Sequence, residues 1–562
     1  MNGRYVFATA LAAACLLAAC GGGGFAPAAH QAPSAMRAHA AAPTPYPLPK
    51  KTPDFTTVEK PVPWDYTSTG PDRSACRANE GLTYRVGPGQ AYPEPHDVPW
   101  LRLLPCDTVL IYWRAQAYTD AIYIAVRGKN HKAIAVEGVM NKSGQRPLFD
   151  GSHAMQYASQ GMDPYEICAG MISIGLPSST AVPQQVYGYT PGYIIVENFE
   201  VENAFGKYPG SNQPVYTCTV SGQPVKPWAE FVAGLYIDPA QHLLIKNNYF
   251  HNNGLGAFTN SLDGSHHQSR DFYVTDNTIT DNGNGEASQH NYYFELVGER
   301  VIHNYFGPPI AHTQGENIKD RSVCVEYADN YIDSGNNLIA FRDPQSNGDY
   351  EWHQMDAYGT QCASQLYVHD NTFVSRGPTE FQAMSVIDGF GDGVVEGDPQ
   401  NNRFGVVYFY NNVVIAIGNK DPYGLKSAPV FQNANQLKPT TFYAINNLFY
   451  SAPQTKGHQG PPFAACYWQQ YVNFTSDWAS RKIQTKYATA TDGNDAVGTP
   501  CDGSGMSGIN VSKANPGFVD FAHGDFHLTP SSPFYTLKGS LPAPIAQRHL
   551  QPTNGSYPTP SP

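Results

Sequence analysis

The sequence predicts an all-β fold in which the chain winds as a coil of short, stacked parallel strands. Three observations lead to this prediction. The 562-residue chain is poor in charge, at 15%, and rich in Gly (52), Pro (46) and Tyr (36), which suits short strands and turns better than long surface helices. A pattern of an alternating apolar strand, an Asn and a second short apolar pair recurs along the middle of the chain. Its copies are 26 to 41 residues apart, a spacing typical of repeat architectures.

The repeated Asn is the residue that indicates a coil. The copies include LLIKNNYFHNN, DFYVTDNTITDN, CVEYADNYIDSG and LYVHDNTFVSRG. They place seven residues in register: Asn248, Asn277, Asn304, Asn330, Asn371, Asn412 and Asn447. Asn tolerates left-handed backbone geometry, and its amide can bond both its own bend and the next turn, so stacked turns would form an Asn ladder. A β-sandwich or propeller is the alternative, but the Asn-Gly hairpin turns expected there do not recur.

The order of segments along the chain follows from this coil. Residues 344 to 362 and 453 to 510 break the period and are interpreted as loop excursions. The expected organisation is a signal peptide (1–19), a lipidated Cys and tether (20–62), an N-terminal cap (63–106), the coil (107–452), an excursion (453–510), a closing turn (511–545) and a disordered tail (546–562).

The N-terminus is typical of a bacterial lipoprotein signal. A single early Arg precedes an apolar run, and Leu17, Ala18, Ala19 and Cys20 form the cleavage box before a Gly run. Acylated Cys20 and an Ala/Pro-rich tether would anchor the protein. In this class, Gly after the Cys indicates the outer membrane, facing periplasm or exterior. An ordinary signal peptide that contains a Cys is the alternative.

Eight cysteines follow Cys20, and an even number in an exported chain favours disulfides over metal ligation. We expect sequential neighbours to pair. One such pair, Cys324 with Cys362, would close the excursion at 344 to 362.

Two features of the sequence resemble known families. The strand repeats, over roughly residues 107 to 452, resemble the pectate-lyase-like superfamily, which implies a right-handed parallel β-helix with loop excursions. Within it, ENIKDRSVCVEYADNYIDSGNNLIAFRD (316–343) resembles the family-six polysaccharide lyases, the chondroitinase B and alginate lyase group. The resemblance implies that Lys319 is the base of a β-elimination and Arg342 the acid or proton donor.

Two cations suit this chemistry because elimination from a uronate removes a proton beside a carboxylate. Neutralising that carboxylate stabilises the enolate-like transition state. A Lys crowded by another cation can act as base, whereas Arg stays charged and is a better clamp. In the resembled family a calcium ion often neutralises the carboxylate, but its acidic ligand positions fall on His312 and Gln314 here, leaving Glu316. We therefore expect no required cofactor and no metal ligands, with calcium as the alternative.

Further candidates lie near these two residues. QHNYYFE (289–295) places His290, a catalytic candidate, near Tyr292 and Glu295, which we expect to bind substrate from one face of a strand. Arg321 and His353 are further candidates for substrate binding; His353 lies in the excursion that would stand over the groove.

The leading functional prediction is a lipid-anchored enzyme that cleaves an acidic polysaccharide by β-elimination. A net charge of −12 argues against a nucleic-acid binder. Two alternatives are a non-catalytic polysaccharide-binding lipoprotein and a glycoside hydrolase using two carboxylates among Glu295, Asp343, Asp349 and Glu351. A solvated surface on which Lys319 and Arg342 pair with Asp320 and Asp343 is the non-functional alternative. We predict that Lys319 and Arg342 project from neighbouring turns of one sheet, with α-carbons within about 10 Å.

Overall fold

The structure is a computed structural model of the full chain. All residues that it describes lie in one compact unit, residues 45–562. The described residues are 51–59, 64–162, 167–186, 188–206, 216–229, 231–259, 268–285, 288–310, 313, 315–334, 337–342, 365–376, 385–389, 406–417, 428–429, 431–433, 440–452, 463–464, 470–480 and 508–533.

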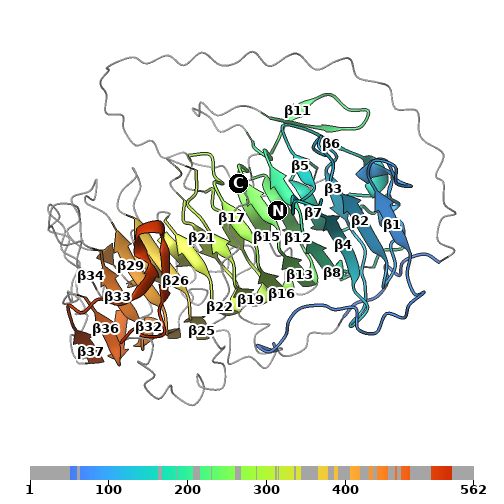
Figure 1. Cartoon of the computed structure of the whole chain (residues 1–562). Coiled ribbons are helices and arrows are strands. Elements are labelled where there is room, and N and C mark those ends of the chain that lie inside the picture. The colour runs from blue at the N-terminus through green and yellow to red at the C-terminus, as the bar shows by residue number, and fades with distance from the viewer. Residues whose placement is uncertain are drawn as a thin grey trace, which may run out of the picture. The chain divides into compact units, whose positions relative to one another are not determined.

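Three large parallel sheets form the coil, and within the described residues they contain twelve, nine and eleven strands (Figure 1). The twelve-stranded sheet consists of β1 (Thr83–Val86), β2 (Thr108–Tyr112), β4 (Ile134–Val139), β8 (Gly192–Glu197), β13 (Gln241–Lys246), β16 (Arg270–Thr275), β19 (Val297–Ile302), β22 (Val323–Ala328), β25 (Gln365–His369), β28 (Val406–Tyr410), β32 (Thr440–Ile445) and β35 (Gln470–Thr475). The nine-stranded sheet consists of β3 (Ile122–Ile124), β7 (Gly170–Gly175), β12 (Ala233–Asp238), β15 (Leu255–Thr259), β18 (Tyr292–Phe294), β21 (Ile318–Asp320), β24 (Asn337–Phe341), β27 (Ser385–Gly389) and β31 (Phe431–Asn433). The eleven-stranded sheet consists of β5 (Leu148–Asp150), β9 (Glu200–Glu202), β14 (Tyr249–His251), β17 (Thr278–Thr280), β20 (Tyr305–Phe306), β23 (Tyr331–Asp333), β26 (Thr372–Arg376), β29 (Val413–Ile417), β33 (Leu448–Ser451), β36 (Asp477–Ala479) and β37 (Ile509–Val511).

Smaller elements decorate the coil. They are the sheet of β6 (His153–Gln156), β10 (Thr217–Val220) and β11 (Lys226–Pro227), the pair β30 (Ala428–Pro429) and β34 (Phe463–Ala464), the hairpin β38 (Phe518–Asp520) and β39 (Asp525–Leu528), and four 3-10 turns at Pro95–Asp97, Trp100–Arg102, Ala158–Gln160 and Phe521–His523. In the described part of the chain, no helix is long and apolar enough to cross a membrane.

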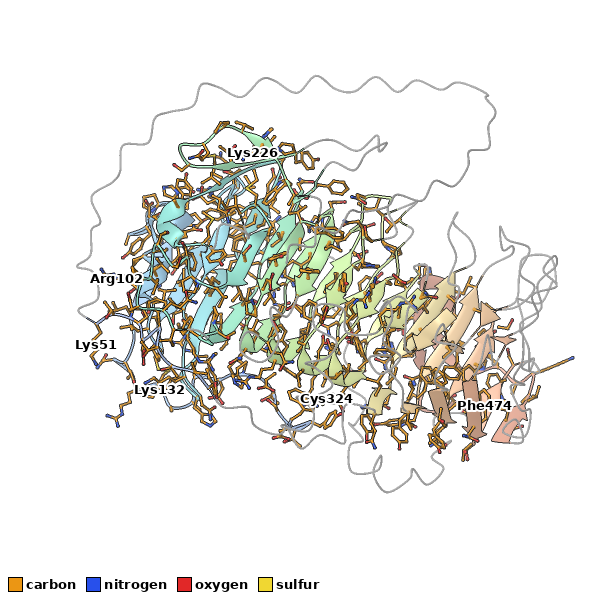
Figure 2. The ribbon with its side chains drawn as sticks, turned by 180° about the vertical axis from the view of Figure 1, so that it is seen from behind. Lys51, Arg102, Lys132, Lys226, Cys324 and Phe474 are labelled. Carbon is orange, nitrogen blue, oxygen red and sulfur yellow. A yellow bond between two sulfur atoms is a disulfide. The ribbon has the colours of Figure 1, made fainter. Side chains whose placement is uncertain are left out.

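Each full turn visits the three sheets in one order. β12 is followed by β13 in the twelve-stranded sheet and by β14 in the eleven-stranded sheet, and β15 then pairs in parallel with β12. Inward residues of successive turns pack into one continuous apolar core, such as Leu235 and Ala257, which pair in register. Figure 2 shows side chains along this coil, with Lys132 near one end and Phe474 near the other. The predicted parallel β-helix is confirmed.

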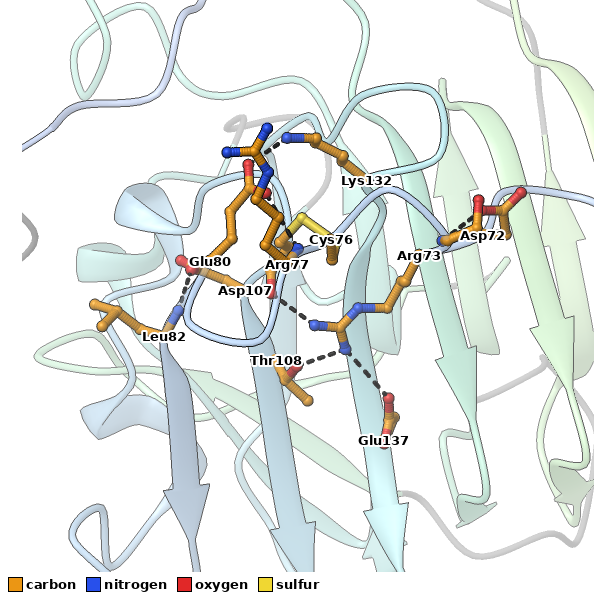
Figure 3. The surroundings of a disulfide bond; sticks show 12 residues. Asp72, Arg73, Cys76, Arg77, Glu80, Leu82, Asp107, Thr108, Lys132 and Glu137 are labelled. Carbon is orange, nitrogen blue, oxygen red and sulfur yellow. Dashed lines mark hydrogen bonds and ion pairs between the residues drawn. A yellow bond between two sulfur atoms is a disulfide. The ribbon is translucent and has the colours of Figure 1, made fainter.

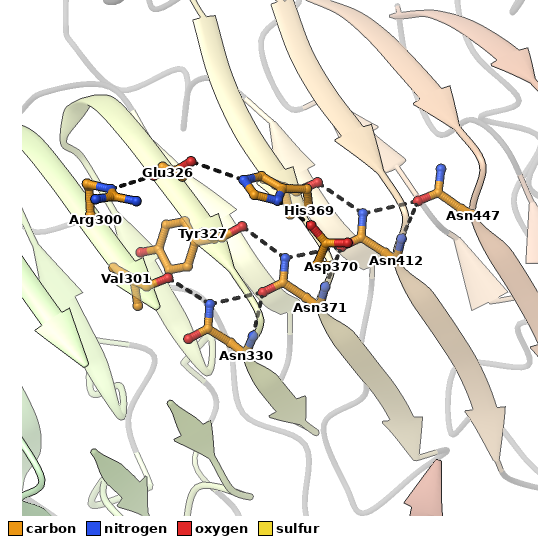
Figure 4. A network of polar contacts seen from close by, with 11 residues as sticks. Arg300, Val301, Glu326, Tyr327, Asn330, His369, Asp370, Asn371, Asn412 and Asn447 are labelled. Carbon is orange, nitrogen blue, oxygen red and sulfur yellow. Dashed lines mark hydrogen bonds and ion pairs between the residues drawn. The ribbon is translucent and has the colours of Figure 1, made fainter. Parts of the chain in front are cut away.

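The predicted Asn ladder is confirmed as well. The backbone N–H and the side-chain amide of Asn330 both donate to Oδ1 of Asn371, at 2.9 Å each, and the side-chain amide of Asn330 also donates to the carbonyl of Val301 at 2.8 Å (Figure 4). The pattern repeats from Asn248 to Asn447, and the last rung is the buried carboxylate of Asp477. The ladder therefore satisfies buried polar groups at the bend between the twelve- and eleven-stranded sheets.

The first residues of the described chain lie on the outer face of the twelve-stranded sheet, and we call residues 51–59 and 64–72 the N-terminal strap. Phe55 is buried against Tyr189, at 5.3 Å between ring centroids. Tyr66 makes an edge contact with Tyr367, and Arg300 bonds the carbonyl of Ser68. Residues 51–59 thus pack on the coil, although their composition favoured a free tether. The Ala/Pro-rich composition of the whole predicted tether, residues 20–62, gave no indication of this buried Phe.

The strap also explains why a glycine stands at position 298. Gly298 has φ +84° and lies against the ring of Trp64, where an added Cβ would come within 2.4 Å of the indole. Residues with a side chain rarely adopt this backbone geometry, and the missing Cβ leaves room for the ring.

Two disulfides join sequential neighbours, as predicted. Cys76 is bonded to Cys106 and Cys168 to Cys218. Beside the first, Arg73 bonds the carbonyl of Cys106 at 2.6 Å and holds the cap to the first turns (Figure 3). Cys324 is also disulfide-bonded, and its predicted partner Cys362 lies outside the described residues.

The coil extends beyond its predicted end at residue 452. β35 continues the twelve-stranded sheet in register with β32, and β36 continues the eleven-stranded sheet next to β33. Residues 470–480 are therefore a turn of the coil and not part of an excursion. The long insertion before them hid the period.

Candidate functional site

A column of outward side chains runs along the nine-stranded sheet. Tyr236, Phe258, Tyr293 and Lys319 occupy paired positions of four successive strands. Each is half-buried, whereas the residues that flank it in its strand are almost all buried. Outward residues of a parallel sheet stack one turn apart, about 4.8 Å between strands. The column therefore presents three aromatic rings followed by a cation.

A second Asn ladder, which the sequence analysis missed, holds these strands in register. Asn282 donates to Oδ1 of Asn291 at 3.0 Å, and Asn291 donates to Oδ1 of Asn317 at 2.9 Å. Tyr293 and Lys319 each follow a rung by two residues. The signal was present in the sequence: Asn253 in HNN and Asn282 in the second TDN each stand five residues after a residue of the first ladder. The ladder fixes where along the strand each site residue stands.

Arg342 projects from the turn after Lys319. Lys319 pairs with Ala340, and the N–H of Arg342 donates to the carbonyl of Asp320 at 2.7 Å. Arg342 is therefore one strand away from Lys319 and two residues further along, which corresponds to about 8 Å between α-carbons. The prediction that both side chains project from neighbouring turns of one sheet is confirmed.

Glu316 draws the Arg342 guanidinium back across the sheet. Arg342 Nη2 lies 2.8 Å from Glu316 Oε1. Glu316 precedes β21 whereas Arg342 follows β24, so the ion pair joins the two ends of neighbouring strands on the side of the sheet where Lys319 stands.

His290 completes a His–Glu–Arg cluster. Its Nδ1 lies 3.2 Å from Glu316 Oε2 and 3.1 Å from the Glu316 carbonyl. Burial would raise the pKa of the Glu316 carboxyl, but Arg342, His290 and Lys319 outweigh it and hold that pKa at about 2. Burial lowers the pKa of His290 to about 3; Glu316 opposes this effect, whereas Lys319 and Arg342 reinforce it. The cluster therefore holds a carboxylate and a neutral imidazole at neutral pH.

Tyr293 lies between two cations. Arg321 Nε donates to the phenol oxygen of Tyr293 at 2.9 Å, and Lys319 Nζ lies 5.0 Å from the ring centroid. The ring also makes edge contacts with His290, at 5.4 Å, and with Phe258, at 5.3 Å. These contacts hold the ring in place from four sides.

Tyr292, predicted to bind substrate, points into the core, so that prediction is wrong. It is fully buried, stacks on Phe294 at 3.8 Å and bonds Glu299. Successive strand residues alternate between faces, and the pairing of Tyr293 with Lys319 sets which of the two tyrosines faces out. The prediction for Tyr292 corresponds to the opposite alternation of the strand.

The remaining candidates have mixed positions. Glu295 is buried, at 2% exposure, level with Arg321 at the ends of their strands. Asp320 faces the interior, where it accepts hydrogen bonds from Tyr327 and from the N–H of Ser322. Outside the described residues lie His353, Cys20, His312, Gln314, Asp343, Asp349 and Glu351.

Nothing among the described residues forms a metal site: no group of three or more His, Cys, Asp or Glu side chains is placed to hold an ion there. The charged residues of the described face near Lys319 are Lys319, Arg321 and Arg342, with two carboxylates, Glu316 and Glu295, so the cations outnumber the anions by one. This arrangement favours an anion.

Comparisons with known proteins add likenesses of fold. No protein-family model matches the chain, and no curated protein matches it. Among solved structures, the catalytic unit of a GH87 alpha-1,3-glucanase from Streptomyces thermodiastaticus is 12% identical, covers 73% of this chain and has a TM-score of 0.39. The match spans 65% of the glucanase chain, just under two thirds.

Two other matches are similarly distant. Pectate lyase Pel9A is 11% identical over 72% of this chain and 81% of its own, with a TM-score of 0.36. An alginate lyase from Paenibacillus is 9% identical over 72% of this chain and 99% of its own, with a TM-score of 0.29. At these levels the fold assignment rests on the strand pairing, and the site rests on its own geometry.

Proposed function

We propose that the chain is an enzyme that cleaves an acidic polysaccharide by β-elimination on the outer face of the nine-stranded sheet. The observation that carries the proposal is that Lys319 and Arg342 project from adjacent turns of this sheet, beside an aromatic column. A polymer of uronates would lie along the column, with its carboxylate at the cations and its sugar rings on the aromatic side chains.

In this reaction Lys319, in its unprotonated form, takes the proton from the carbon beside the substrate carboxylate. Arg342 holds that carboxylate and stabilises the charge that develops on it in the transition state. A guanidinium carries five N–H donors in a fork, so it has the capacity to bond Glu316 and a substrate carboxylate together. Glu316 Oε1 lies 2.8 Å from Arg342 Nη2, and this ion pair fixes the position of the guanidinium.

The proposal includes a localisation in the cell. Cys20 would be the acylated residue, and residues 21–50 would connect it to the strap, placing the coil at the outer membrane on its periplasmic or outer side. Globomycin treatment of expressing cells tests this: accumulation of the uncleaved precursor supports lipidation, and unaltered processing in Cys20→Ala contradicts it.

A second candidate is a polysaccharide-binding protein without turnover, and the ion pair between Arg342 and Glu316 favours it. In that function the cations hold the polymer and the pair never opens. For a glycoside hydrolase, the candidate carboxylates Asp343, Asp349 and Glu351 lie outside the described residues, and Glu295 is buried at 2% exposure. The pKa of Glu316, held at about 2, makes that residue unsuitable as the general acid near neutral pH.

The experiment is a screen of the full chain against polymannuronate, polyguluronate, polygalacturonate and glycosaminoglycans, following the ultraviolet absorbance of the new double bond. We expect absorbance on at least one polymer and its loss in Lys319→Ala. Binding without absorbance on any polymer supports the second candidate. New reducing ends without absorbance contradict elimination.

A further inference from the structure

Tyr293 stands directly opposite Lys319 on the outer face. The two residues are paired in neighbouring strands, and both are half-buried. A sugar seated over the lysine amine is therefore also next to the tyrosine, one strand spacing of about 4.8 Å away. The phenol oxygen is held by Arg321 Nε at 2.9 Å.

We propose that Tyr293 is a catalytic residue of the elimination and protonates the departing glycosidic oxygen. This inference rests on the proposed function and assigns to Tyr293 the proton transfer that the resemblance gives to Arg342. Arg342 then has one role, that of holding the substrate carboxylate.

The proton transfers balance without any further reactant. Lys319 takes the proton from C5, the electron pair forms the C4–C5 double bond, and the C4–O bond breaks. The departing oxygen takes the phenol proton of Tyr293. The phenolate that remains is stabilised by the Arg321 guanidinium, which already donates to that oxygen. Exchange with water, from the ammonium to the phenolate, restores both groups.

Other described groups at the site are less suited to this step. A guanidinium does not give up its proton in a protein, so Arg342 and Arg321 are poor acids. His290 is fully buried and neutral, and it lies at the edge of the Tyr293 ring at 5.4 Å between centroids. Tyr292 faces the core. Tyr293 alone of these groups combines an O–H donor, exposure and a fixed position beside the base.

The test uses Tyr293→Phe in the full chain, with Tyr236→Phe as the matched control. Tyr236 stands in the same column two turns earlier and is equally half-buried. On polygalacturonate or polymannuronate, we expect kcat of Tyr293→Phe to fall about 100- to 10,000-fold, the usual range for a lost general acid. Tyr236→Phe keeps kcat and changes KM alone. The alkaline limb of the kcat profile, which reports the acid, disappears in Tyr293→Phe.

A leaving-group experiment separates proton donation from ring positioning. The probe is a methyl uronoside with a 4-nitrophenoxy group at C4, whose departing oxygen needs no proton. Tyr293→Phe cleaves this probe at close to the wild-type rate, whereas Lys319→Ala stays inactive on it. Equal losses on probe and polymer would overturn the inference, and so would a Tyr293→Phe variant as active on polymer as Tyr236→Phe. A wild-type protein that is inactive on every substrate would instead contradict the proposed function.

Discussion

Two faces of the coil carry the same three residue types, and they use them in opposite ways. On the nine-stranded sheet, Glu316 bonds His290 and Arg342, at 3.2 and 2.8 Å. On the twelve-stranded sheet, Glu326 bonds His369 and Arg300, at 3.1 and 2.6 Å (Figure 4). Distances and burial are similar, so they do not explain the difference between the two clusters.

The added charge beside each cluster is what differs. Asp370 lies 2.7 Å from His369, and although burial opposes it, Asp370 and Glu326 raise the pKa of that His to about 9. Lys319 stands beside the other cluster, where the pKa of His290 is lowered to about 3. The cluster on the twelve-stranded sheet, under the strap, thus holds two cations and two anions. Around the cluster on the nine-stranded sheet, Lys319, Arg321 and Arg342 face the two carboxylates of Glu316 and Glu295, which leaves one net positive charge for a ligand.

The largest expected effect is on turnover. Lys319→Ala should lose about 100- to 10,000-fold in kcat because the base is gone, with the melting temperature unchanged. Lys246→Ala is the control, since Lys246 is exposed on the twelve-stranded sheet. Rates of elimination on the active polymer measure both. Equal activity of the two variants would break the functional distinction between the faces.

The next effect is on stability. Glu326→Gln leaves the buried Arg300 without its carboxylate and leaves His369 paired with Asp370 alone, which should cost about 3–5 kcal/mol of unfolding free energy. Glu137→Gln is the control, because Glu137 forms a longer pair, 3.7 Å from Arg73, at half-exposed positions of the same sheet. Such exposed pairs contribute about 0–1 kcal/mol. Urea denaturation compares the two variants. A cost below about 1 kcal/mol for Glu326→Gln would show that the cluster does not stabilise the fold as expected.

The two histidines predict opposite pH dependences of stability. The folded-state pKa of His369, about 9, is above its unfolded value, so its contribution is present below about pH 6.5 and is lost as pH rises through 9. His369→Gln should therefore cost most near pH 6 and least near pH 10. The folded-state pKa of His290, about 3, is depressed, so protonation of the unfolded chain penalises folding as pH falls below about 6.5. The cost of His290→Gln should shrink from pH 7 to pH 4. Parallel trends of thermal stability with pH would contradict the assignment of the two protonation states.

The smallest effect concerns the strap. Glu59 accepts from Tyr193 Oη at 2.6 Å, bonds Arg127 and lies 3.2 Å from His242 Nε2. Glu59→Gln should cost about 1 kcal/mol, because the carboxylate is partly solvated, and should raise proteolysis and amide exchange at residues 51–59. Lys51→Gln, an exposed change at the start of the strap, should leave both unaltered. Unchanged protection in Glu59→Gln would show that apolar contacts alone hold the strap.

The repeat architecture could be predicted from the sequence because one residue, the ladder Asn, recurs where each turn bends. Lys319 and Arg342 could be placed on neighbouring turns for the same reason. Which side chains of a strand face outward could not be predicted in the same way. In YYF either Tyr292 or Tyr293 could face the core, and the pairing of Tyr293 with Lys319 shows that Tyr293 faces out. The His–Glu–Arg cluster joins residues 26 positions apart through side chains, which no local pattern reports.

Hydroxyl-radical footprinting of the wild-type chain, with and without an oligomer of the cleaved or bound uronate, tests the central claim most directly. Oxidisable aromatic residues stand on both sheets. Those on the nine-stranded sheet are Tyr236, Phe258 and Tyr293, and those on the twelve-stranded sheet are Tyr408 and Tyr443, whose rings stack at 5.6 Å between centroids. We predict that the oligomer protects the first three residues and leaves the oxidation of Tyr408 and Tyr443 unchanged. Protection of Tyr408 and Tyr443 with unchanged oxidation of Tyr293 would contradict the account.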